Sequence, residues 1–313
     1  METSTYIFYI IIMVSSYVSI KFSQRLFLRL KIQDDIVERS SHSVIATRSG
    51  GIAIFSIILI TSVYNYLKGI EIFDFSLIIP LSLLVFVGIY DDVYKLDFKL
   101  KFIFQIIAAK IIIDNGFIID NLHGVFGIYE TGRVFAQVLT IFIIVAIINS
   151  INFIDGIDGL AISIVLLFLF FFEFFAKSQT ILFNLTVIIM CSIMPLFLFN
   201  FRKEQKVFLG DSGSLFLGGV TSIYIIHILT NSYIIKETYD IHKILFVLSI
   251  FIYPVVDIIR IFFLRIYRGK SPFDADKNHI HHLLLKETNS HFITTFIIVL
   301  TSLLFLLLIQ IMF

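Results

Sequence analysis

Long apolar runs alternate with short polar connections along the whole chain. Each run is roughly 17 to 25 residues long, which is enough for an α-helix to cross a bilayer. The runs cover residues 4–22, 49–67, 74–90, 100–118, 134–151, 159–176, 179–199, 213–230, 243–264 and 290–313. This pattern predicts an all-α integral membrane protein with about ten transmembrane helices. No low-complexity linker or long polar insertion interrupts it, so we expect residues 1–313 to form a single domain.

The composition supports a membrane protein. Hydrophobic residues make up 58% of the chain, charged residues make up 15%, and the mean hydropathy is +0.97. These values lie outside the usual range of soluble domains. The net charge of +1 favours no nucleic-acid partner, and the single Cys191 excludes an internal disulfide. The residues before the first run carry no Lys or Arg, so we expect that run to stay as a transmembrane helix.

The basic residues are distributed unevenly between the two predicted sides of the membrane. Most of the 24 Lys and Arg residues fall in the odd-numbered connections, and the even-numbered connections hold few. Because cytoplasmic loops are enriched in Lys and Arg, the odd-numbered connections are predicted to be cytoplasmic. Both termini are then predicted to be extracytoplasmic.

Four polar motifs all fall in odd-numbered connections. They are Asp91-Asp92, Asn149-Ser-Ile-Asn152-Phe-Ile-Asp155-Gly-Ile-Asp158-Gly-Leu-Ala161, Gly210-Asp211-Ser212-Gly213 and His279-Ile-His281-His282. Ionised groups beside hydrocarbon are rare unless a cavity, a cation or a substrate keeps them there. We therefore predict that the four loops assemble one site at the cytoplasmic face.

The longest motif has the side chains of a magnesium site. Asn149, Asn152, Asp155 and Asp158 recur at intervals of three, so at the end of a helix they share one face. Amide and carboxylate oxygens are ligands suited to Mg²⁺, which also binds substrate phosphates. Gly156 would let a phosphate approach the backbone. Capping of a helix is the alternative, but it accounts for one such residue and not for four.

Two shorter motifs add charge to the same face. The adjacent charges of Asp91 and Asp92 repel each other unless a cation or a lysine neutralises them, and a solvated loop with lysine partners is the alternative. The sequence around Asp211 resembles the nucleophile motif of serine proteases, but it opens an apolar run, so we reject a protease. A turn whose aspartate reaches a metal, and whose following helix presents N–H groups to an anion, fits better.

The histidine motif leaves three alternatives open. Ring N–H groups of His279, His281 and His282 suit a phosphate or a sugar, and nearby basic residues favour an anion. A metal site and a plain surface loop are the other two. In the preceding run, Pro254 predicts a kink, and Asp257 and Arg260 are spaced to pair with each other on one face.

In this order, the four motifs resemble the polyprenyl-phosphate N-acetylhexosamine-1-phosphate transferase superfamily, glycosyltransferase family 4, over roughly residues 30–285. The resemblance implies Mg²⁺-dependent transfer of a sugar-1-phosphate from a UDP-N-acetylamino-sugar to undecaprenyl phosphate, a membrane lipid, with release of UMP. Mn²⁺ is expected to substitute for Mg²⁺. The resemblance also implies a multi-pass protein of the bacterial cytoplasmic (inner) membrane and a homodimer.

The resemblance assigns roles to individual side chains. The metal ligands are expected to be Asn152 and Asp211. The catalytic residues are expected to be Asp91, Asp92, Asp155 and Asp158. The substrate-binding residues are expected to be Lys101, Asn149, His279, His281 and His282.

Two chemical routes stay open at this point. The lipid phosphate can attack the sugar-bearing phosphorus directly, or Asp155 can form a covalent aspartyl-phosphate intermediate. A phosphate monoester is already mostly dianionic at pH 7, so a general base would contribute little. We therefore expect Asp91 and Asp92 to orient the lipid phosphate, Lys101 or the metal, and not chiefly to abstract a proton.

The sugar and the polymer are less defined than the reaction. The histidine motif is similar to that of bacterial enzymes that initiate O-antigen, common-antigen or teichoic-acid chains. Residues Glu38-Arg39-Ser40-Ser41-His42 resemble the branch that loads N-acetylfucosamine or N-acetylquinovosamine phosphate, although Ile36-Val37 replaces its usual Pro-Asn. A polytopic transporter or lipid flippase is the rival interpretation. Transport sites, however, lie near the bilayer midplane, and these acids lie at the ends of runs.

Overall fold

The computed structural model describes residues 2–33, 46–70, 72–230, 233, 235, 241–269 and 278–312. This part of the chain is mostly helical. The α-helices are α1 (Glu2–Arg29), α2 (Gly50–Leu67), α3 (Ile78–Tyr94), α4 (Phe98–Asp114), α5 (Arg133–Ile154), α6 (Leu160–Phe175), α7 (Phe183–Asn200), α8 (Gly210–Leu229), α9 (Ile241–Ile250), α10 (Ile252–Tyr267), α11 (Ile280–Thr288) and α12 (His291–Met312). Two 3-10 turns, Phe75–Leu77 and Val125–Gly127, and two short strands, β1 (Ala46–Thr47) and β2 (Lys206–Val207), complete it.

The helices follow the predicted apolar runs, but fewer have the length of a full span. Seven described helices are long and apolar enough to cross a membrane, and the count rises to eight if the bent pair α9–α10 forms one span. The two predicted runs that fall short are α4, with 17 residues, and α6, with 16. The turn at Gly116, with φ of 90°, follows the end of α4, and Gly159, with φ of 73°, precedes the start of α6. The turn at Gly116 ends α4 before the end of its predicted run at residue 118, whereas α6 begins and ends within one residue of its predicted run.

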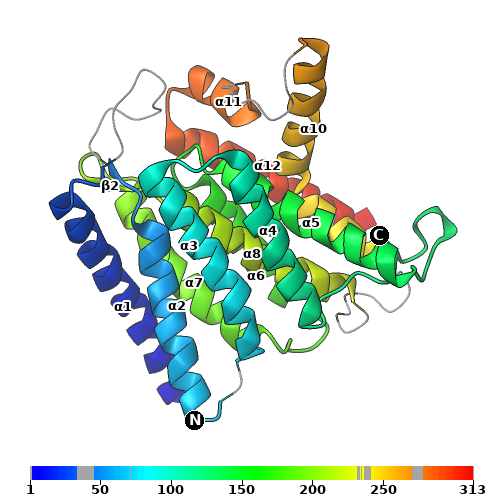
Figure 1. The fold of residues 1–313 in the computed structure, drawn as a ribbon, viewed down its shortest axis with the longest axis horizontal. Coiled ribbons are helices and arrows are strands. Elements are labelled where there is room, and N and C mark those ends of the chain that lie inside the picture. The colour runs from blue at the N-terminus through cyan, green and yellow to red at the C-terminus, as the bar shows by residue number, and fades with distance from the viewer. Residues whose placement is uncertain are drawn as a thin grey trace.

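Helix α8 is the centre of the bundle. Nearly all of its side chains are buried, and it packs against α2, α3 and α5 (Figure 1). Glycines on the neighbouring helices allow a close approach. A Cβ atom at Gly51 would lie 2.1 Å from the backbone nitrogen of Gly213, and one at Gly88 would lie 2.4 Å from that of Ser212. The polar start of α8 is therefore held directly against α2 and the end of α3.

This close packing makes a testable prediction about stability. Gly51→Ala is expected to lower the apparent melting temperature of the detergent-solubilised protein, because the added methyl group overlaps the α8 backbone and overpacking destabilises by about 1–3 kcal/mol. Gly132→Ala is the matched control, since Gly132 has an ordinary φ of −65° and no atom within 4 Å of the new Cβ. Equal melting temperatures for the two variants would contradict the packing.

The short strands were not predicted from the sequence. β1 and β2 pair in parallel, with Ala46 opposite Lys206 and Thr47 opposite Val207. The ladder continues as the backbone N–H of Gly51 donates to the carbonyl of Leu209 at 2.8 Å. Two residues are too few to show the alternating pattern of a strand. The pair ties the start of α2 to the start of α8.

The predicted kink near Pro254 is confirmed. α9 and α10 meet at an angle of 74° at Phe251, and Pro254 lies in the first turn of α10, where its missing N–H leaves no intrahelical bond unmade. Figure 1 shows α10 standing away from the rest of the bundle, at the upper right. The predicted pair is also present, since Arg260 donates to Asp257 Oδ1 at 3.0 Å.

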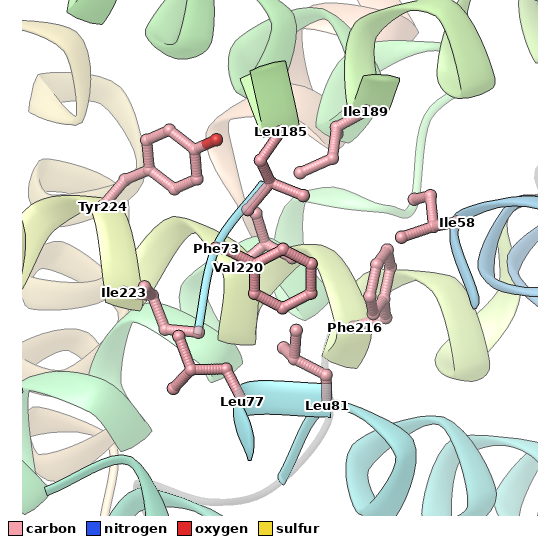
Figure 2. A pocket seen from close by; sticks show the side chains of 10 residues that line it. All are labelled: Ile58, Phe73, Leu77, Leu81, Leu185, Ile189, Phe216, Val220, Ile223 and Tyr224. Atoms are coloured by element: carbon pink, nitrogen blue, oxygen red, sulfur yellow. The ribbon is translucent and has the colours of Figure 1, made fainter. Parts of the chain in front are cut away.

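One apolar pocket lies between α2, α3, α7 and α8, and its lining from α8 runs from Phe216 to Tyr224 (Figure 2). Its lining consists of Ile58, Phe73, Leu77, Leu81, Leu185, Ile189, Phe216, Val220, Ile223 and Tyr224. The Tyr224 hydroxyl is paired with Thr186 Oγ1 at 2.9 Å. The pocket is therefore a feature of the apolar core and lies outside the polar site described next.

Candidate active site

Four helix ends bring the predicted polar residues together. Asp91 and Asp92 lie in the last turn of α3, and Lys101 lies in the first turn of α4. Asn152 lies in the last turn of α5, and Asp211 is the second residue of α8. Because α3 packs against both α4 and α8, and α5 packs against α8, these ends meet at one end of the bundle.

Lys101 is the cation that joins two of the predicted acids. Its Nζ lies 2.7 Å from Asp91 Oδ2 and 2.8 Å from Asp211 Oδ1. The Lys101 side chain is only 14% exposed, so these pairs are shielded from water and from salt. The other oxygen of Asp91 accepts the backbone N–H of Leu96 at 2.8 Å, which closes the turn after α3.

Asp92 makes different contacts from its neighbour. Its Oδ1 accepts the backbone N–H of Asp211 at 2.9 Å, and its Oδ2 accepts that of Ser212 at 3.0 Å. Arg48, which follows β1, places Nη1 at 3.8 Å from Asp92 Oδ1 and at 3.9 Å from Asp211 Oδ2. The Arg48 side chain is 38% exposed, so this cation of the group is partly accessible to solvent.

The two asparagines are held by amide contacts. Asn152 Nδ2 donates to Asp211 Oδ1 and, at 2.8 Å, to Ser214 Oγ. The Asn149 amide exchanges hydrogen bonds with Gln105, with Nδ2 donating to Oε1 at 2.7 Å and Oδ1 accepting from Nε2 at 3.3 Å. Asn152 is therefore in contact with the predicted metal ligand Asp211, whereas Asn149 joins α5 to α4.

Asp155 lies just beyond α5, where burial and neighbouring acids change the pKa of its carboxyl. Enclosure by protein atoms raises the pKa of its carboxyl well above the usual range, and the negative charges of Asp211 and Asp92 raise it further. Arg48 acts in the opposite direction. The raised pKa favours the protonated, neutral form of the Asp155 carboxyl.

The histidine motif packs directly on the longest motif. A Cβ at Gly156 would lie 3.3 Å from His281 Nε2 and 3.4 Å from His282 Cε1, so glycine makes room for these rings. His279 and His281 stack with their ring centroids 5.4 Å apart. The predicted convergence of this loop with the α5–α6 turn is therefore present in the structure.

Two residues of α10 orient the histidines. Asp257 Oδ2 lies 2.7 Å from His279 Nδ1, and the Tyr253 hydroxyl lies 2.6 Å from His281 Nδ1. Burial lowers the pKa of His281 to about 3, with further lowering by His282 and His279, so this ring is neutral at pH 7. Nothing in the described ranges pairs with His281 Nε2, the ring nitrogen beside Gly156.

Asp158 is placed differently from the other predicted catalytic acids. Its carboxylate contacts Lys206 of β2, and its backbone N–H donates to His291 Nδ1 at 3.1 Å. Its carbonyl accepts from Thr295 at 2.8 Å. These contacts join the α5–α6 turn to β2 and α12. A catalytic role for Asp158 stays a prediction, and the contacts themselves fix the turn that carries Asp155.

Two groups of side chains in the site carry atoms of the kind that bind metals, the histidine motif and the pair of Asp211 and Asn152. Within the part of the chain that the structure describes, no three His, Cys, Asp or Glu side chains cluster as a metal site. In these ranges the three histidines and their neighbours are therefore not arranged to hold a metal ion. Mg²⁺ needs only one or two protein carboxylates, with water and substrate phosphates as its other ligands, so Asp211 with Asn152 suits it.

Several contacts of the site were missed at the level of the sequence. Gln105 carried a signal, because it is an amide in the middle of a predicted apolar run. Arg48 carried a weaker one, as a basic residue beside the Gly50-Gly51 pair that opens a span. Nothing in the local pattern distinguished Tyr253. The predicted sugar-branch motif, Glu38–His42, lies outside the described residues.

Comparison with known proteins identifies the family of the chain. The model of glycosyl transferase family 4 matches residues 74–229, which include α3, α5 and the whole of α8. A probable undecaprenyl-phosphate N-acetylglucosaminyl 1-phosphate transferase of Bacillus subtilis (strain 168) is 30% identical over 291 residues, which cover 90% of this chain and 77% of the relative. Undecaprenyl-phosphate alpha-N-acetylglucosaminyl 1-phosphate transferases of Yersinia pestis and Escherichia coli (strain K12) are 28% and 27% identical, covering 84% and 85% of this chain and 72% of each relative.

The described helices are those of a membrane protein, and the matching family and relatives are transferases, so the class is that of a membrane-embedded transferase. The chain belongs to glycosyl transferase family 4, in the superfamily of polyprenyl-phosphate N-acetylhexosamine-1-phosphate transferases. The resemblance identified from the four motifs is therefore confirmed.

Proposed function

We propose that this enzyme transfers an N-acetylamino-sugar-1-phosphate from a UDP-sugar to undecaprenyl phosphate and releases UMP. The observation that carries the proposal is the Lys101 bridge between Asp91 and Asp211 where four helix ends meet, beside Asn152. The names of the relatives support the lipid acceptor and suggest UDP-N-acetylglucosamine as the first donor to test. The product would be the lipid-linked sugar that starts a cell-envelope polysaccharide.

Charge balance supports Mg²⁺ as the cofactor, with Mn²⁺ as a substitute. Lys101 and Arg48 already face Asp91, Asp92 and Asp211, so the negative charge that two phosphate substrates bring would leave a deficit of positive charge. A divalent cation would offset that deficit, and Asn152 and Asp211 would hold it. When bound, Mg²⁺ would neutralise the diphosphate and stabilise the charge on departing UMP.

The chain's own residues would act mainly by positioning and neutralising charge, because phosphoryl transfer brings two anions together. Lys101 would face the phosphates with an ammonium group held in place by two carboxylates. Arg48, which is partly exposed, would contact the phosphate of the second substrate. Neutral His281 would offer a ring nitrogen and no charge. Because the lipid phosphate is already mostly dianionic at pH 7, its attack on the sugar-bearing phosphorus would need no strong base.

We place the site at the cytoplasmic face of the bacterial inner membrane, with both termini outside. The uneven distribution of Lys and Arg supports this orientation. A homodimer remains an expectation from the family resemblance. A transporter or flippase gains no support, since the polar groups lie at the ends of helices and the relatives are named as transferases.

The experiment that tests the proposal is an assay of UMP release. Purified protein should release UMP from UDP-N-acetylglucosamine only when undecaprenyl phosphate and Mg²⁺ are both present, and Mn²⁺ should restore activity after chelation. A panel of UDP-sugars, including those of N-acetylfucosamine and N-acetylquinovosamine, then identifies the donor. UMP released in one burst without lipid would favour the covalent Asp155 route over direct attack. No UMP from any donor would refute the proposed reaction.

A further inference from the structure

Asp91 and Asp92 are neighbours in sequence, but their carboxylates have different partners. Successive residues of a helix point about 100° apart, so the two side chains cannot share one set of contacts. Asp91 faces Lys101 and the turn after α3, whereas Asp92 faces the first turn of α8. The two carboxylates therefore act at different places, and the proposed chemistry gives Asp92 no role of its own.

We propose that Asp92 is a positioning residue: it caps the N-terminus of α8, and so holds Asp211 in place, without contacting either substrate. The proposal rests on the proposed transfer reaction, in which Asp211 is a metal ligand. Both Asp92 oxygens are occupied by backbone N–H groups, those of Asp211 and Ser212, and the side chain is 1% exposed. A carboxylate so enclosed is closed to a lipid phosphate.

The surrounding glycines fit this role. Gly88 lies one helical turn before Asp92 on the same face of α3, and a Cβ there would lie 2.4 Å from the backbone nitrogen of Ser212. Gly210, with φ of 73°, begins α8, and a Cβ there would lie 2.8 Å from Asp92 Oδ2. Gly88 thus admits the α8 backbone, and Gly210 leaves space for the capping carboxylate.

Capping has a physical reason at this position. The first N–H groups of a helix have no intrahelical partner, and a negative charge is favourable beside them. The cap from α3 is unusual because it comes from a different helix, about a hundred and twenty residues away. It fixes the backbone of Asp211, whose side chain must meet Lys101 and Asn152 together. Arg48 offsets the repulsion between the Asp92 and Asp211 carboxylates.

The test combines hydrogen exchange with kinetics on the full-length protein in detergent. Asp92→Asn keeps one accepting oxygen and turns an amide N–H₂ toward α8. We expect exchange in the peptide covering the first turn of α8 to become about 5- to 30-fold faster, the factor associated with a lost cap. Asp91→Asn is the matched control and should leave that peptide unchanged, because Asp91 does not contact α8 backbone groups.

The kinetic arm separates positioning from direct action on substrate. Asp92→Asn should lower kcat by the same factor from pH 6 to pH 9 and leave KM for undecaprenyl phosphate unchanged. Gly210→Ala should reproduce both effects, because its methyl group displaces the cap while every polar side chain is kept. Unchanged α8 exchange in Asp92→Asn, recovery of its activity at high pH, or a raised lipid KM would each overturn the proposal. If the wild type lacks transferase activity, the proposed reaction fails, and the exchange result alone decides whether Asp92 caps α8.

Discussion

Lys101→Met is expected to reduce the rate of UMP release by about 10²- to 10³-fold, the range seen when one preorganised charge-stabilising group is removed from an active site. The ammonium group of Lys101 lies between Asp91 and Asp211, so its loss leaves two enclosed carboxylates without their shared cation. The negative charge of these two carboxylates would also repel the two phosphate substrates. The measurement is kcat/KM for UDP-N-acetylglucosamine at saturating lipid and Mg²⁺.

Two further variants of α4 show whether the loss of activity depends on the position of the charge and on the kind of cation. Lys99→Met removes the same charge from an exposed position two residues away and should keep nearly full activity. Lys101→Arg keeps the charge but replaces a compact ammonium by a planar guanidinium, so we expect it to remain strongly impaired. If Lys101→Met retained activity within about twofold of wild type, a range far below the stabilisation by one such group, Lys101 would not be part of the site.

Asp211→Asn is expected to have an effect at least as large, about 10³-fold or more on kcat. Asp211 contacts Lys101 and Asn152 through one oxygen and faces Arg48 with the other. The neutral amide would weaken all three contacts and remove the carboxylate proposed to hold Mg²⁺. Activity should therefore not return when Mg²⁺ is raised from millimolar to tens of millimolar.

The matched control is Asp97→Asn. Asp97 precedes α4, is exposed, and makes no side-chain cap bond, so the same chemical change there should leave activity and Mg²⁺ dependence unaltered. Normal Mg²⁺ dependence in Asp211→Asn would remove Asp211 from the set of metal ligands. An activity loss shared equally by both variants would indicate a general effect of charge and not a specific site.

The helical fold was largely predictable, because an apolar run of spanning length has few alternatives in a membrane. The lengths of individual helices were less so. α4 ends at a glycine turn inside its predicted run, and the bend at Phe251 was indicated only through the nearby Pro254. Local sequence thus predicted which segments are helical more reliably than where each helix stops.

For the site, too, the sequence predicted which residues take part better than which residues contact each other. Asp91, Asn152 and Asp211 were identified as one group, because charge is rare beside hydrocarbon and the motifs share a predicted side. Lys101 was assigned to the group only through the family resemblance. The individual partners of these residues were not identified. The contact between Asp158 and Lys206 joins residues 48 positions apart, and no local periodicity encodes such a pairing.

The central claim is that phosphate travels with the sugar, and isotope labelling tests it most directly. UDP-N-acetylglucosamine carrying ³²P only at the sugar-bearing phosphorus would be incubated with the purified protein, undecaprenyl phosphate and Mg²⁺. Our account predicts that the label enters the lipid-extractable product while unlabelled UMP appears in equal amount. Labelled UDP in the aqueous phase, beside an unlabelled lipid-linked sugar, would show transfer of the sugar alone and would contradict the account.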